Sequence, residues 1–404
     1  MTAVRQGGTI RAINAVGRVA SGLGLRARLD ADSLLDAASA RTGLDDFGSP
    51  DFREGLDVLT GSLEHEAQLT PLGRVAARTR LLGLLENRLR LVERHHDPAV
   101  RAEVLSRPVF VLGLPRTGTT VLYGMLAANP AMRAPASWEV ARPFPAPAGE
   151  DPARVAAMDK DLAGFRRLAP GIDHIHPLGA RLPQERLAMH ALEMTSYEFP
   201  TTYPVPGYWA WLRERDLRGA YELEKRLLQH LQSGGHRGAH WILKTPCHLM
   251  WLDVLLEVFP DALLVHTHRD PATVLASVSS LMTTMRSAVS ARVDLVTVGR
   301  EQLDAWTWGM ERVMAVRERL PADRVVDVQY ADTVADPVGT VRRVYEHFGL
   351  DYTDEVAGGV RRYLVANPRD KHGTHTYSLA DFGLAAGEVE AAFAGYNDRF
   401  GVRP

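Results

Sequence analysis

Apolar residues in the first quarter of the chain recur at helical rather than strand spacing. In residues 71–93, the apolar positions follow a 3.6-residue repeat and leave the arginines on other faces. These positions are Leu72, Val75, Leu81, Leu82, Leu85, Leu89 and Val92. The pattern predicts a helical N-terminal region over residues 1–105.

After residue 105, short apolar runs alternate with helical stretches. Residues 109–112 form an apolar run before a glycine, and residues 119–128 form a helical pattern that stops at Asn129-Pro130. Further strand-like runs cover residues 241–243, 263–266 and 325–328, and helical patterns cover 249–258 and 301–319. Residues 134–150 are rich in Pro and Ala and predict an extended loop, and residues 151–238 are mostly helical. Strands alternating with helices predict an α/β fold over residues 106–404, with a P-loop-type parallel sheet flanked by helices.

Composition and net charge exclude some classes of function but do not identify one. The 404 residues carry a formal net charge of -2, so no overall positive field draws the chain to nucleic acid, and an anion site must be local. A single cysteine, Cys247, excludes an internal disulfide framework and fits a cytoplasmic location. No run approaches the ~20 apolar residues that cross a bilayer.

The first 28 residues contain arginines but no acidic residue. The arginines are at positions 5, 11, 18, 26 and 28, and apolar residues recur at helical spacing at positions 10, 13, 16 and 19. Such a helix can lie on an anionic membrane surface. The pattern equally fits a first helix packed on the domain, and we favour this second interpretation.

A phosphate-binding loop is predicted between the strand at 109–112 and the helix at 119–128. Its sequence is Gly113-Leu114-Pro115-Arg116-Thr117-Gly118-Thr119-Thr120. The glycines permit a tight backbone path with inward N–H groups, and the following helix adds its N-terminal donors. Nucleotide triphosphatases have a lysine after the second glycine, but this chain has Thr119 there. The cation is Arg116, inside the loop, which argues against a P-loop kinase or triphosphatase.

This loop resembles the 5'-phosphosulfate loop of the sulfotransferases that depend on 3'-phosphoadenosine-5'-phosphosulfate (PAPS). The arginine form is typical of the bacterial branch and of the tyrosylprotein enzymes, which are related to the cytosolic sulfotransferases. The resemblance implies PAPS as sulfonate donor, adenosine 3',5'-bisphosphate as product, and donor binding by residues 115–120. These residues are Pro115, Arg116, Thr117, Gly118, Thr119 and Thr120.

A second phosphate site is expected after the strand at 263–266. Arg269 lies where this strand ends, the usual ligand edge of an open α/β sheet, and Ser277 follows two helical turns later. The pair resembles the family's 3'-phosphate site, which ATP and GTP would leave empty. The resemblance also implies that Tyr330 contacts adenine. More loosely, it implies a basic loop over the 3'-phosphate, with Arg369, Lys371 and Gly373.

Sulfonate transfer requires cations at the leaving oxygen and a base for the acceptor hydroxyl. Arg116 and Lys244, which ends the strand at 241–243, are the candidate cations. For the base, His248 is the first choice because its ordinary pKa suits neutral pH. Glu139 and Glu185 are the alternatives. Because cytosolic members have a histidine two residues after this lysine, the spacing here departs from their pattern.

The loop and helical insertion of residues 134–240 are expected to build the acceptor pocket. Its candidate lining residues are Phe199, Tyr203, Tyr208, Trp209 and Met282, which suggest a small apolar acceptor with one hydroxyl. We expect no catalytic metal, because neither the helix at His65 nor the His174-x-His176 pair completes a ligand set. A non-catalytic nucleotide-binding protein is the remaining alternative, and Lys244 argues against it.

Overall fold

The computed structural model describes residues 8–22, 26–236, 238–368 and 377–402. Five parallel strands form one sheet in the order β2-β3-β1-β4-β5. The strands are β1 (Val109–Gly113), β2 (Met132–Arg133), β3 (His240–Lys244), β4 (Leu263–His268) and β5 (Val325–Gln329). The predicted α/β fold with a parallel sheet flanked by helices is confirmed. The two-residue strand β2, at the sheet edge, is an element that sequence patterning did not predict.

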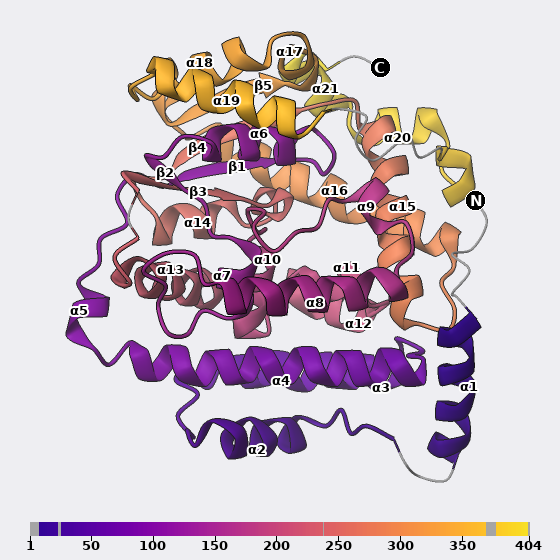
Figure 1. Cartoon of the computed structure of the whole chain (residues 1–404). Coiled ribbons are helices and arrows are strands. Elements are labelled where there is room, and N and C mark those ends of the chain that lie inside the picture. The colour runs from indigo at the N-terminus through magenta and orange to yellow at the C-terminus, as the bar shows by residue number, and fades with distance from the viewer. Residues whose placement is uncertain (1–7, 23–25, 237, 369–376, 403–404) are drawn as a thin grey trace.

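One face of the sheet is covered by helices that follow β1 and β5 in the chain (Figure 1). Val109 and Val111 of β1 pack on this face together with the apolar side chains of these helices. The helices are α6 (Thr119–Ala127), α17 (Tyr330–Ala335), α18 (Pro337–His347) and α19 (Asp354–Ala366).

The other face packs against the larger apolar core, to which Phe110 and Leu112 of β1 contribute. Its helices, together with the 3-10 turns near them, are α13 (Arg218–Ser233), η2 (Pro246–Leu249), α14 (Leu252–Val258), α15 (Pro271–Val289), α16 (Leu295–Arg317), η3 (Ala322–Arg324), η4 (Leu379–Phe382), α20 (Ala386–Ala392) and α21 (Ala394–Phe400). Helix α16 begins six residues before the predicted 301, because Asp294 caps it by accepting from Thr297 N at 2.8 Å.

Residues 134–240 contain a series of helices, so the mostly helical pattern predicted for residues 151–238 is confirmed. They comprise α7 (Ser137–Ala141), α8 (Pro152–Leu168), α9 (Ile172–Ile175), α10 (Leu187–His190), η1 (Ala191–Glu193), α11 (Glu198–Thr202) and α12 (Pro206–Arg213), followed by α13. Helix α7 lies inside the segment predicted as an extended loop. Its N-terminus is capped by a carboxylate three residues in, since Glu139 accepts from Ala136 N at 2.8 Å.

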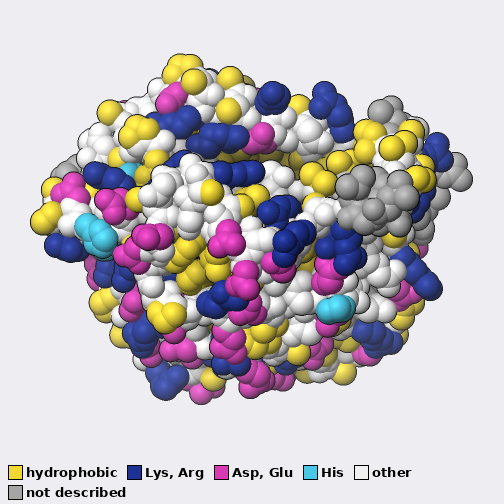
Figure 2. Space-filling view, turned by 90° about the horizontal axis from the view of Figure 1, so that it is seen from below, with side chains coloured by type: hydrophobic (Ala, Val, Ile, Leu, Met, Phe, Trp, Pro, Cys, Tyr) yellow, Lys and Arg dark blue, Asp and Glu magenta, His cyan; other side chains and the backbone are white. Residues whose placement is uncertain are grey.

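The described helices of the N-terminal region lie at the base of the molecule in Figure 1, with the first helix standing at one end. This region contains α1 (Gly8–Gly22), α2 (Ala31–Thr42), α3 (Phe52–His65), α4 (Pro71–Arg94) and α5 (Pro98–Arg101), and its apolar residues join the larger core. Helix α4 confirms the pattern at 71–93, with Thr70 as its cap and Pro71 in its first turn. Acidic and basic side chains are interspersed over the underside of the molecule (Figure 2). Among the described helices, none is both long and apolar enough to span a membrane.

Candidate active site

The loop between β1 and α6 is held in a conformation that its glycines permit. Gly113 and Gly118 have φ values of 146° and 84°, in the region that side chains rarely adopt. A Cβ on Gly113 would lie 2.3 Å from Thr267 Oγ1, and one on Gly118 would lie 2.9 Å from the ring of Tyr330. The loop is braced from within, because Thr117 Oγ1 donates to Leu114 O at 2.6 Å. This path ends at the N-terminus of α6, as expected for an anion site.

Arg116 links the loop to the predicted second phosphate site. Its Nε donates to Ser277 Oγ at 3.1 Å, and its Nη1 donates to the carbonyl of Ile175 at 2.6 Å. Arg269 lies on the other side, where its Nη1 donates to Arg116 O at 2.9 Å. Burial, together with the nearby charge of Arg269, lowers the pKa of Arg116. Two guanidinium groups and a buried serine therefore converge beside the loop.

Two tyrosines flank these guanidinium groups. The guanidinium carbon of Arg269 lies 4.2 Å from the ring centroid of Tyr330, a cation–π contact at the beginning of α17. Tyr377 donates its hydroxyl to Ser277 Oγ at 2.6 Å. Sequence reasoning did not identify Tyr377 as a site residue, although it belongs to the tail segment that follows the predicted basic loop. The predicted residues Arg369, Lys371 and Gly373 lie outside the described residues.

Lys244 lies at the carboxyl end of β3, facing α6. Its Nζ donates to Thr120 Oγ1 at 3.1 Å and forms a short ion pair with Glu185. Glu185 is brought there because Arg186 N donates to the carbonyl of Lys244 at 3.2 Å. His176 completes the group, with Nε2 3.9 Å from the Glu185 carboxylate.

This cluster sets the protonation states of its members. Burial alone would raise the pKa of Glu185, but the charges of Lys244 and Arg116 hold that pKa below its ordinary value. Burial lowers the pKa of His176, so its ring is neutral at neutral pH. A carboxylate that is 23% exposed thus lies beside an almost fully buried ammonium group. The approach of His176 to Glu185 depends on the fold, so sequence spacing indicates His176 only as a possible metal ligand.

The structure does not bring His248 to this cluster. Lys244 pairs in register with Val111, so both side chains lie on the α6 face of the sheet. His248 instead packs against Phe110, with ring centroids 5.2 Å apart, on the opposite face. Its Nδ1 lies 2.9 Å from the hydroxyl of Tyr221, and burial lowers its pKa well below the ordinary value. Turn η2 directs the ring into the core, where it has a packing role.

Glu139 is likewise engaged in local structure. One carboxylate oxygen caps α7, and the other accepts from Arg133 Nη2 at 3.2 Å. The residue is 3% exposed. Both oxygens therefore have partners on this segment, and Glu139 does not join the cluster around Lys244.

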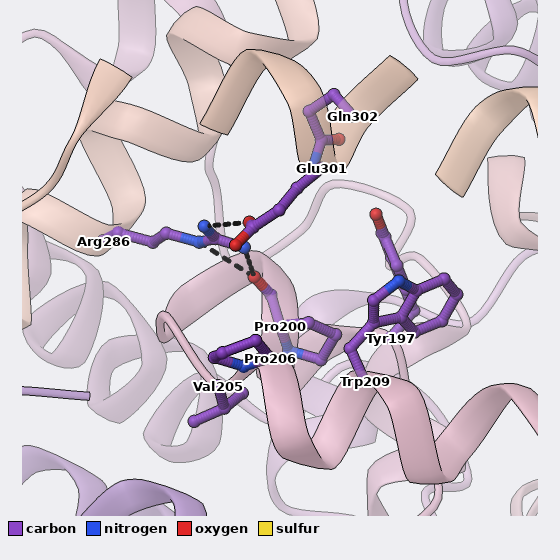
Figure 3. Close-up of a pocket in the computed structure, with 8 residues that line it drawn as sticks. All are labelled: Tyr197, Pro200, Val205, Pro206, Trp209, Arg286, Glu301 and Gln302. Atoms are coloured by element: carbon purple, nitrogen blue, oxygen red, sulfur yellow. Dashed lines mark hydrogen bonds and ion pairs between the residues drawn. The ribbon is translucent and has the colours of Figure 1, made fainter. Parts of the chain in front are cut away.

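The predicted acceptor-lining residues prove to be mostly core. Phe199, Tyr203, Tyr208 and Met282 are buried in the larger apolar cluster, because the insertion packs its aromatic rings against α15 and α16. Trp209 lines a pocket (Figure 3). The walls of this pocket are Tyr197, Pro200, Val205, Pro206, Trp209, Arg286, Glu301 and Gln302. Within this pocket, Arg286 pairs with Glu301 at 2.5 Å and donates to the carbonyl of Pro200. The guanidinium group of Arg286 and the carboxylate of Glu301 therefore already have partners.

Ligand atoms of three residues converge near the ends of β4 and β5. They belong to His266, His268 and Asp327. Arg317 donates to both carboxylate oxygens of Asp327 at 2.9 Å and contacts His266 Nδ1 at 2.8 Å. The cation that balances this carboxylate is therefore a guanidinium group.

The same network contacts the backbone of the predicted second phosphate site. His268 Nε2 lies 2.8 Å from Asp327, and its Nδ1 lies 3.3 Å from the hydroxyl of Tyr396. That hydroxyl also accepts from Arg269 N at 3.3 Å. The C-terminal helix α21 thus holds the backbone from which Arg269 extends.

A parallel sheet with an anion loop at its carboxyl edge defines an α/β protein of the P-loop type. A model of the sulfotransferase family matches residues 108–354. The chain therefore belongs to the sulfotransferase family, and it is a sulfotransferase.

Curated relatives and solved structures agree with this assignment. The omega-hydroxy-beta-dihydromenaquinone-9 sulfotransferases Stf3 of Mycobacterium bovis and Mycobacterium tuberculosis are each 28% identical over 293 residues, covering 67% of this chain and 70% of the relative. The solved sulfotransferase STF1 of M. tuberculosis is 34% identical, with a TM-score of 0.79, covering 90% of this chain and 98% of its own. Sulfotransferase STF9 of Mycobacterium avium is 30% identical, with a TM-score of 0.84, covering 93% and 98%.

Proposed function

We propose that this enzyme takes its sulfonate from PAPS. The observation that carries the proposal is the bridge made by Arg116 between two anion sites. Its backbone belongs to the loop at the N-terminus of α6, and its guanidinium reaches Ser277 beside Arg269. A donor with phosphates at both the 5' and 3' positions would engage both groups. ATP has no 3'-phosphate and would leave Arg269 and Ser277 without a charged partner.

The transfer step uses the cluster around Lys244. A bond forms between the acceptor oxygen and sulfur, and the bond from sulfur to the bridging oxygen of the 5'-phosphate breaks. Lys244 and Arg116 offset the negative charge that develops on that leaving oxygen. Glu185 takes the proton of the acceptor hydroxyl, because its carboxylate is ionised, partly exposed and next to Lys244. Adenosine 3',5'-bisphosphate is the second product.

We further propose that the acceptor is a small lipophilic molecule with a hydroxyl group. The curated relatives are named for the sulfation of a hydroxylated dihydromenaquinone, an apolar acceptor of this kind. In this chain, the segment from α9 to Glu185 lies beside Arg116 and Lys244, so the acceptor would enter along it.

Calorimetry with the purified chain tests the donor. We expect adenosine 3',5'-bisphosphate to bind at least about tenfold more tightly than adenosine 5'-phosphate, because hydrogen bonds to a charged group contribute about 1.5–3 kcal/mol. Binding should require no magnesium. Arg269→Ala should remove this preference, whereas Arg343→Ala, at an exposed ion pair with Asp332, should retain it. ATP binding as tight as that of the bisphosphate would contradict the proposal. Labelled PAPS and a panel of hydroxylated acceptors would then test the transfer itself.

A further inference from the structure

Helix α1 is fixed to the body of the protein along one side. Ile10 and Asn14 are buried, and Asn14 Oδ1 accepts from Leu72 N at 3.1 Å. Gly17 faces Pro71 so closely that an added Cβ would lie 2.5 Å from the proline ring. These positions follow one another at helical spacing and form a single inward seam against the start of α4. Figure 1 shows α1 standing across this end of α4.

The opposite side of α1 is apolar and exposed. Ile13, Val16 and Val19 are 48%, 71% and 68% exposed, and Ala12 and Ala15 lie exposed between them. In Figure 2, hydrophobic side chains gather at the end of the molecule that carries α1. Because the inward seam fixes the helix, this apolar face is held outward rather than folded into the core.

The charge on α1 has one sign. The helix contains no acidic residue, and its Arg11 and Arg18 are exposed on one flank of the apolar face. Neither forms an ion pair with another described residue. Arg26 and Arg28, by contrast, pair with Glu64 and Asp30 at 3.2 and 3.0 Å. An apolar face beside unneutralised arginines is the pattern of a helix that lies in the surface of an anionic bilayer.

We propose that α1 docks this enzyme on an anionic lipid surface, with Val16 and Val19 in the acyl boundary and the two arginines on lipid phosphates. A second copy of the chain fits this face less well. A stable dimer buries about 800 Å² on each partner, whereas the face is one helix of 15 residues, about 22 Å long. Pairing two copies would also supply no acidic groups for the arginines.

The proposal deepens the proposed function, on which its relevance to catalysis rests. Helix α15 carries Ser277 of the donor site near its beginning, and near its end the carbonyl of Val289 accepts from Thr70 N at 2.9 Å. Thr70 caps α4 at the place where α1 packs. About 18 Å of helix therefore separates the donor site from the membrane-docking end. An enzyme docked there would meet a lipophilic acceptor dissolved in the bilayer.

Vesicle flotation of the full chain tests docking without donor or acceptor. The probes are vesicles of phosphatidylcholine alone and of phosphatidylcholine with phosphatidylglycerol in equal amounts. We expect binding to the anionic vesicles only, weakening with added salt. Val16→Glu with Val19→Glu should reduce binding at least about tenfold, and Arg11→Ala or Arg18→Ala about fivefold each. Val104→Glu, at a position that is 75% exposed outside α1, is the matched control and should bind like wild type.

The outcomes separate docking from catalysis. Wild type that stays in solution with anionic vesicles, or a Val16/Val19 double variant that still floats, would overturn the proposal. Concentration-dependent dimerisation that the double variant abolishes, without vesicle binding, would overturn it in favour of a second copy. The double variant should keep wild-type turnover on a water-soluble acceptor and lose it on a vesicle-borne one. If wild type instead showed no turnover on any hydroxyl acceptor, this result would refute the proposed function and not the docking proposal.

Discussion

Replacing Glu185 by Gln tests the assignment of the base with almost no change in shape. General base catalysis contributes about 10²–10⁴-fold, so turnover should fall by at least 100-fold, or about 2.7 kcal/mol in activation free energy. Lys244 would lose its charged partner, and because Glu185 is 23% exposed we expect only about 1–3 kcal/mol of lost stability. Thermal unfolding should therefore show a folded variant. Turnover is then measured with labelled PAPS and expressed per folded molecule.

The pH profile adds an independent readout. Lys244 and its neighbours hold the pKa of Glu185 below its ordinary value, so wild-type turnover should stay level as the pH falls from 7.5 to 5.5. Turnover should decline only below the pH range in which an ordinary glutamate titrates.

His176→Gln should keep turnover within about tenfold of wild type, because the His176 ring lies beside the Glu185 carboxylate but does not itself take the proton.

The matched control is Glu193→Gln. This carboxylate is buried outside the candidate active site, and it pairs with Arg88 at a distance of 2.5 Å. It should lower the thermal midpoint and leave turnover per folded molecule unchanged. Glu139→Gln and His248→Phe test the two other candidate bases in the same assay and should behave like this control. Glu185 is not the base if Glu185→Gln keeps more than a tenth of wild-type turnover. The same conclusion follows if Glu139→Gln or His248→Phe loses activity instead.

Three further outcomes follow from the contacts. Gly118→Ala should raise the KM for PAPS about tenfold or more. A left-handed φ costs a residue with a side chain about 1–2 kcal/mol, and the new Cβ would contact the ring of Tyr330. An unchanged KM in steady-state kinetics would contradict this. Tyr377→Phe should weaken the binding of adenosine 3',5'-bisphosphate at least about tenfold and the binding of adenosine 5'-phosphate little, because the Tyr377 hydroxyl donates to Ser277 Oγ. Equal losses of affinity for the two nucleotides in calorimetry would contradict a place for Tyr377 in the predicted 3'-phosphate site. The buried histidines have lowered pKa values, so the unfolded chain binds protons first and stability is lost as the pH falls below about 6.5, at up to about 1.4 kcal/mol per pH unit and histidine. Urea unfolding between pH 7.5 and 5 measures this loss, and a free energy of unfolding that holds or rises as the pH falls would refute the prediction. The buried histidines with lowered pKa values are His190, His230, His248, His266 and His268.

Local sequence was sufficient to predict the tight loop after β1 and every strand of the sheet except β2. A continuous apolar run such as 109–112 can only be buried on both faces, and glycines at 113 and 118 permit a turn that few other residues adopt. Arg269 and Ser277 could be predicted as a pair for a similar reason. The end of a parallel strand and the helix that follows it lie together in every α/β fold. In the structure both residues contact Arg116, Ser277 through its hydroxyl and Arg269 through its guanidinium, and their binding of one phosphate stays a prediction.

Which of the candidate bases lies beside Lys244, in contrast, depends on which face of the sheet each side chain takes. Four residues separate Lys244 from His248, but the turn η2 sends the histidine to the Phe110 face and the strand sends the lysine to the α6 face. Glu185 is distant in sequence and reaches Lys244 through a backbone hydrogen bond of Arg186. Spacing along the chain carries no information about such a contact. The sequence by itself determined the fold class and the tight glycine-containing loop at residues 113–118, because both follow from short-range pattern and backbone freedom. Only the tertiary structure decided which carboxylate meets the lysine and which apolar face stays outside, because both depend on packing between distant segments.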